Sequence, residues 1–123
     1  MIPLLFAVAA LYDGVLGLIG LFASGTLYGW FGVTPPNHPG YVQFPGALLV
    51  VFALMFVAVA SNPAKNRELI PYGMLLKVSF CGIVFYHWLT AGLPDMWKPF
   101  AVADAVFLVL FVWAYTRLRA TAK

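Results

Sequence analysis

The chain has 123 residues, of which 63% are hydrophobic and only 9% are charged. A soluble domain carries roughly 25% charged residues, so this chain has too few charges to cover a water-facing surface. The composition therefore predicts an integral membrane protein. Seven basic and four acidic residues give a net charge of +3. The basic residues mostly lie beside apolar segments rather than together on one face, so no nucleic-acid partner is expected.

Four apolar segments are long enough to cross a hydrocarbon core, which takes about 20 helical residues. We expect helices over residues 3–23, 41–60, 70–91 and 97–115, which form an all-α transmembrane four-helix bundle in a single membrane domain, 1–123. The first segment lacks the basic start of a signal peptide, so we expect it to be retained. A proline lies at or near the start of each helix, where its missing N–H needs no partner, and marks a start rather than a kink. These prolines are Pro3, Pro45, Pro71 and Pro99.

The connecting segments predict the orientation. Residues 24–32, rich in glycine and aromatic side chains, are expected either to extend the first helix or to lie in the membrane interface. Residues 33–40 contain three prolines, which exclude a regular helix. With four spans, both termini and the second loop lie on one side of the membrane and the first and third loops on the other. The first side has five basic residues and the second has only Lys98, so the positive-inside rule places both termini in the cytoplasm. The five are Lys65, Arg67, Arg117, Arg119 and Lys123.

Three ionisable residues fall inside the apolar segments: Asp13, Lys77 and Asp104. At 1.5 Å per residue they lie about 15, about 10–12 and about 16–18 Å from the inner ends of their helices, which predicts one shared buried polar cluster. If all three were charged the cluster would carry a net −1, and protonation of one carboxylate would lower its energy. The pattern fits either a proton relay or a structural ion pair that fixes how the helices pack.

Helical spacing predicts the surroundings of each charge. Small residues lie one or two helical turns from Asp13 on the same face, including Ala10, Gly17 and Gly20, and allow close helix packing inside the bundle or at a subunit interface. Asp104 lies on an aromatic stripe, and we expect ligand or lipid contacts from this stripe and from the thiol near Lys77. The residues concerned are Phe100, Phe107, Phe111 and Cys81.

Other candidate sites are weaker. His38 and His87 are the only histidines and lack the spacing of metal ligands, so no metal is predicted and an interfacial hydrogen bond is the preferred role for each. Cys81 is the only cysteine, which excludes an intramolecular disulfide, and is interpreted mainly as a small packing residue. No cofactor is predicted, although a quinone or a lipid would suit a pocket formed by Lys77, Asp104 and the aromatic stripe.

Short motifs resemble a group of small bacterial four-span membrane proteins, loosely DoxX-like. They are Tyr12-Asp13, the stretches 36–43 and 62–67, Lys77 and Asp104. The resemblance covers nearly the whole chain. It implies the bacterial inner membrane and a link to respiratory or thiol redox systems. Small multidrug resistance transporters also have four spans and a carboxylate in the first helix. They use Glu there and have no equivalent of Lys77 or Asp104, so their mechanism is not carried over.

Three functions follow as hypotheses. The first is an accessory or scaffold subunit of a larger membrane complex, in respiration or another redox system, whose partners would be lipid, other membrane subunits or further copies of the chain. The second is a homo-oligomeric, proton-coupled transporter of a small molecule. The third is a membrane enzyme that handles a quinone or a lipid. The sequence contains no catalytic triad, metal motif or nucleotide-binding loop.

Overall fold

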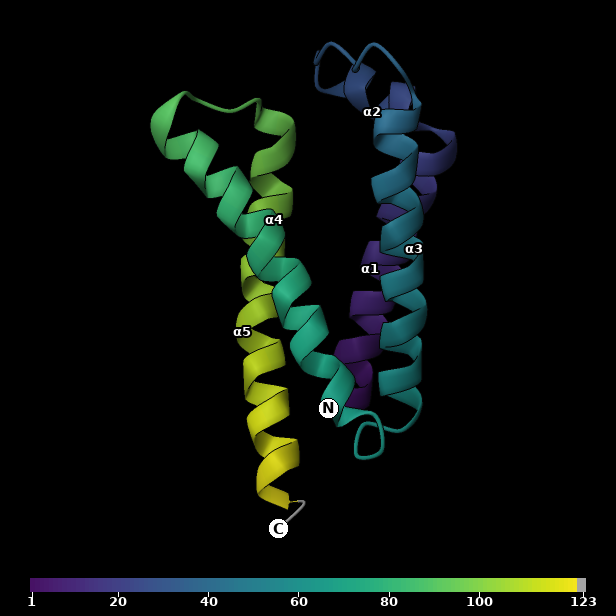
Figure 1. Ribbon diagram of the computed structural model, residues 1–123, viewed down its shortest axis with the longest axis vertical. Helices are drawn as coiled ribbons and strands as arrows, with labels where there is room; N and C mark the ends of the chain where they lie inside the picture. Colours follow the sequence, from purple (N-terminus) through teal and green to yellow (C-terminus); the bar gives the residue numbers. More distant parts are fainter. Residues whose placement is uncertain (122–123) are drawn as a thin grey trace.

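The structure, a computed structural model, describes residues 1–121, and this part of the chain is helical without any β-strand. Four long helices alternate in direction, so that α1 begins and α5 finishes at the same end of the molecule (Figure 1), called the terminal end below. The opposite end, which holds α2, is called the α2 end. Each long helix is long and apolar enough to cross a membrane. The four are α1 (Ile2–Phe22), α3 (Gly40–Ser61), α4 (Ile70–Thr90) and α5 (Lys98–Thr121).

The connections contain three short helices. The α2 helix (Ser24–Trp30) is separate from α1, because the backbone at Ala23 leaves the helical region at φ −142° and ψ 25°. The 3₁₀ turns η1 (Arg67–Leu69) and η2 (Asp95–Trp97) precede α4 and α5. Residues 24–30 therefore do not extend the first helix.

The expected helix bounds differ from those of the structure by no more than one residue, except at the C-terminal end of α5. That helix continues past residue 115 to Thr121, because polar residues such as Arg117 and Arg119 favour helix while ending the apolar pattern. Lys123, which the orientation argument includes, lies outside the described residues.

Pro45 does not mark the start of its helix, contrary to the sequence prediction. The α3 helix begins at Gly40, and Pro45 lies inside it. The first turn forms earlier because the carbonyl of Pro39 accepts hydrogen bonds from the N–H groups of Val42 and Gln43, both at 3.0 Å. Pro3 and Pro71 do lie in the first turn of their helices, as expected.

The helices form two pairs, α1 with α3 and α4 with α5, as Figure 1 shows. Glycines allow α1 and α3 to approach closely: a Cβ atom at Gly17 would lie 2.6 Å from the carbonyl oxygen of Gly46. One at Gly20 would lie 3.2 Å from the Gly46 Cα. The small residues after Asp13 therefore pack against α3 of the same chain.

The two pairs meet around an apolar core at the terminal end and spread apart toward the α2 end (Figure 1). In this core the rings of Phe6 and Phe111 stack with centroids 4.8 Å apart, and Phe56 packs against both. Gly73 of α4 provides room for the Phe56 ring, because a Cβ atom there would lie 2.7 Å from it. The core residues are Phe6, Ala9, Ala10, Phe56, Val59, Ile70, Phe111 and Ala114.

Gly17→Ala should destabilise the protein by about 1–3 kcal/mol, because the new methyl group would overlap the α3 backbone, which cannot move like a flexible side chain. Thermal unfolding in neutral detergent measures the effect. Gly82→Ala is the matched control, since nothing lies within 4 Å of a Cβ atom at Gly82 and alanine favours helix. Equal melting temperatures for the two variants would contradict the close contact between α1 and α3.

Candidate functional site

Asp13, Lys77 and Asp104 meet in one buried cluster. The Lys77 ammonium donates hydrogen bonds to both carboxylate oxygens of Asp13, at 2.9 and 3.0 Å, and to Oδ1 of Asp104 at 3.1 Å. Lys77 is fully buried, while Asp13 and Asp104 are 1% and 7% exposed. Because these residues come from α1, α4 and α5, the cluster connects one helix pair to the other.

Aromatic rings surround the ammonium of Lys77. The Nζ atom lies 5.5 Å from the ring centre of Tyr12, 5.9 Å from that of Phe56 and 5.2 Å from that of Phe107. Aromatic faces attract cations, most strongly where water is excluded. The Lys77 ammonium thus contacts two carboxylates and lies among three aromatic rings.

The two carboxylates are not equivalent. Both oxygens of Asp13 accept hydrogen bonds from Lys77, but only Oδ1 of Asp104 does, and within residues 1–121 Oδ2 of Asp104 accepts none. With all three groups ionised the cluster carries a net −1. The excess negative charge of the cluster is therefore assigned to Asp104, whose Oδ2 atom can still accept a hydrogen bond.

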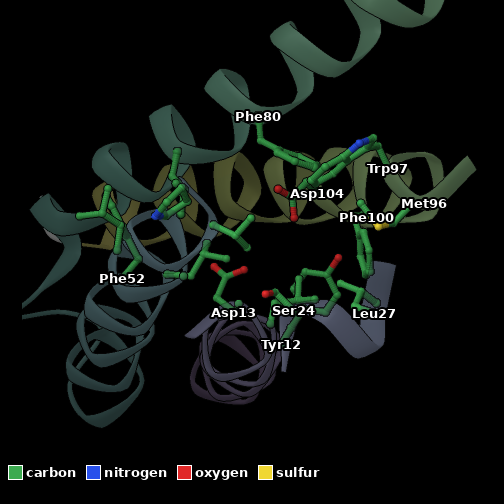
Figure 2. Close-up of a pocket in the computed structure, with 18 of the residues that line it drawn as sticks. Tyr12, Asp13, Ser24, Leu27, Phe52, Phe80, Met96, Trp97, Phe100 and Asp104 are labelled. Carbon is green, nitrogen blue, oxygen red and sulfur yellow. The ribbon is translucent and has the colours of Figure 1, made fainter. Parts of the chain in front are cut away.

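A pocket of about 300 Å³ extends from this cluster toward the α2 end. Figure 2 shows Asp13 and Asp104 on opposite walls of it, with Phe80, Trp97 and Phe100 on the side of Asp104 and with Tyr12 and Ser24 on the side of Asp13. Every helix of the described chain except η1 contributes to its wall. The remaining residues of the wall are Leu16, Gly20, Leu27, Tyr28, Val42, Pro45, Gly46, Leu48, Leu49, Phe52, Leu76 and Met96.

The hydroxyl group of Tyr12 is buried at this pocket and has no hydrogen-bond partner among the described residues. Its ring packs against Phe107, with centroids 5.4 Å apart. Buried hydroxyl groups nearly always have a partner, either in the protein or in a bound molecule. The Tyr12 hydroxyl is therefore an unused hydrogen-bonding group of a residue that lines the pocket.

Of the four residues expected to contact a ligand or lipid, only Phe100 lines the pocket. Phe111 is fully buried in the apolar core, and Phe107 packs against Phe111 and Tyr12. Cys81 is also buried, and its thiol donates a weak hydrogen bond of 3.5 Å to the carbonyl of Ala101. Residues of one aromatic stripe on α5 thus have different surroundings: Phe100 lines the pocket and Phe111 lies in the core.

Neither His38 nor His87 lines the pocket that begins at the cluster. Both are exposed, and Nδ1 of His38 accepts a 2.9 Å hydrogen bond from the N–H of Gly40 in its own loop. The part of the chain that the structure describes contains no group of three or more His, Cys, Asp or Glu residues placed to hold a metal ion.

Sequence reasoning missed most of the pocket wall. Residues such as Phe52, Phe80 and Trp97 are apolar in segments where almost every residue is apolar. In a chain that crosses a membrane, such residues fit lipid contact, core and pocket equally well. Only the charges and the glycine spacing gave a usable signal.

Lys77→Met should lower the free energy of unfolding by about 3–5 kcal/mol, because it leaves two buried carboxylates without a cation. Asp13→Asn should destabilise more than Asp104→Asn, since Asp13 provides two of the three hydrogen bonds. Unfolding by SDS in mixed micelles measures all three variants. Lys98→Met, which breaks the exposed 2.8 Å pair with Asp95, is the control and should change little. Wild-type stability of Lys77→Met would contradict this account of the cluster.

Comparison with known proteins assigns no family to the chain. No protein-family model, curated protein or solved structure matches it. What the site does must therefore be inferred from the geometry of this chain alone.

Proposed function

We propose that the chain is a multi-pass protein of a bacterial cytoplasmic membrane, with both termini inside, that carries a small, largely apolar molecule in exchange for protons. The four long apolar helices support the membrane location. The distribution of charge supports the orientation: basic residues at the terminal end outnumber Lys98 at the α2 end. They are Lys65, Arg67, Arg117 and Arg119.

The observation that supports transport most directly is that the pocket lies on one side of the cluster only. The cluster lies near the middle of the helices. The pocket occupies the space toward the α2 end, and an apolar core that includes Phe6, Phe56 and Phe111 fills the space toward the terminal end. Transporters hold their substrates near the middle of the membrane and give access from one side at a time. Pivoting of the two helix pairs about the cluster would change the side of access.

The carboxylates suit a coupling role. An ionisable group inside a membrane segment is rare and commonly faces a cavity or a proton path. Asp104 lines the pocket and has one oxygen without a hydrogen-bond partner in the described chain, so it can exchange a proton with the contents of the pocket. One chain supplies all three members of the cluster, and the site needs no second copy.

The accessory-subunit hypothesis drew part of its support from two surfaces whose residues pack within the chain. The small residues of α1 pack against α3, and the aromatic stripe of α5 contributes Phe111 to the core and Phe100 to the pocket. The transporter hypothesis and the enzyme hypothesis both require a binding pocket. Transport is preferred because the Asp104 carboxylate offers proton exchange and because the pocket lies on one side of the cluster only.

Leu49→Trp should abolish ligand binding, because the larger side chain would fill the pocket that Leu49 lines. Native mass spectrometry of protein extracted from its membrane measures the fraction that carries a bound small molecule. Leu54→Trp is the matched control on the same helix, since Leu54 is 65% exposed and lies outside the pocket. An empty wild-type protein, or equal occupancy in both variants, would contradict the proposed function.

A further inference from the structure

We infer that the pocket takes a hydrophobic monocation, whose charged group lies against Oδ2 of Asp104 and whose apolar body lies between the two helix pairs. The inference rests on the proposed function and names the class of its substrate. It is argued from the charge of the cluster, the chemistry of the wall, and the size of the pocket.

The charge of the cluster favours a single positive charge. Lys77 neutralises one of two carboxylates, and its three hydrogen bonds leave Oδ2 of Asp104 without a partner in the part of the chain described. A neutral occupant would leave this charge uncompensated in surroundings that disfavour it. An anion would be repelled. A monocation with its charge at Oδ2 makes the cluster and its ligand neutral together.

The wall near Asp104 is built from aromatic rings. Phe80 and Trp97 meet edge to face with centroids 6.3 Å apart, and Phe100 lies on the same side of the pocket (Figure 2). Such rings attract a cation and also contact an apolar body. The protein already uses this combination for Lys77, whose ammonium is surrounded by three rings and held by carboxylates.

The size and polarity of the pocket restrict the cation further. A volume of about 300 Å³ lies at the small end of the range for ligand sites. The wall beyond the cluster is mainly apolar, so a hydrated metal ion would lose its water shell there without replacement ligands. A compact organic cation, such as an amine or quaternary ammonium attached to one ring or a short chain, fits both conditions. The oxygen of the Tyr12 hydroxyl can accept one hydrogen bond from a protonated amine, whereas a quaternary ammonium makes none.

A proton on Asp104 would balance the same charge, so a proton and the ligand cation exclude each other at this carboxylate. The other ionisable groups near Asp104 are Lys77 and Cys81 of α4 and Asp13 and Tyr12 of α1. Lys77 is already held by both carboxylates, so Asp104 is the group at which binding couples to protons. Affinity for the cation should therefore fall as the pH falls.

Two ligands of the same shape test the inference on the wild-type protein. Phenyltrimethylammonium and tert-butylbenzene differ only in the central atom of the branched group, which is a cationic nitrogen in one and a neutral carbon in the other. Calorimetry in neutral detergent, with protein-free micelles as the blank, measures both affinities. We expect the cation to bind at least roughly tenfold more tightly, a preference of about 1.4 kcal/mol.

Asp104→Asn should remove this preference and its pH dependence, whereas Asp95→Asn, the same change at an exposed carboxylate outside the pocket, should retain both. The comparison of the two ligands needs no variant, so a folding defect in Asp104→Asn would not obscure the result. Equal affinities of wild-type protein for the two ligands would overturn the inference and leave the proposed function intact, with a neutral substrate such as a quinone or lipid. Failure to bind either ligand would also overturn the inference, whereas the proposed function is decided separately by the occupancy of the wild-type protein and of Leu49→Trp.

Discussion

The ion cluster of Lys77 with Asp13 and Asp104 is the interaction on which the rest of the structure depends. A fully buried ammonium is tolerated only when carboxylates or other acceptors replace its water, and Lys77 obtains them from both helix pairs. Away from the cluster the two pairs share the apolar core at the terminal end and separate toward α2. The cluster therefore fixes the distance between the pairs at the point where the pocket begins.

The same interaction provides the chemistry of the site. A lysine paired with a single carboxylate would have no net charge and would not attract a charged ligand. The second carboxylate leaves one negative charge in excess. Asp104, which accepts a hydrogen bond from Lys77 through Oδ1 only, lines the pocket. Under the proposed function, stability and ligand binding depend on the same three side chains, and a change that neutralises the cluster alters both. The apolar core contains none of these residues, although the ring of its Phe56 lies 5.9 Å from the Lys77 ammonium.

The sequence predicts this arrangement where charged residues or glycines interrupt an otherwise apolar segment. Three charges in otherwise apolar segments predict a common layer from helical rise alone, and Gly17 and Gly20 predict a close helix contact. The sequence does not identify the partner of that contact, because any helix with a small residue such as Gly46 would fit. Pro45 was misplaced because proline is also tolerated inside a helix when the preceding turn has formed from other residues. The residues of the pocket wall could not be predicted, because an apolar residue in such a segment fits lipid contact, core and cavity equally well.

The central claim, that the cluster holds the two helix pairs together, is tested most directly by a distance between them at the α2 end. Spin labels at Tyr41→Cys on α3 and Tyr86→Cys on α4, both exposed positions, report this distance by pulsed electron paramagnetic resonance in lipid nanodiscs once Cys81 is replaced by alanine. The account predicts that Lys77→Met samples distances longer than any found with Lys77 present, because the pairs then separate instead of pivoting about the cluster. Identical distributions in the two proteins would contradict it.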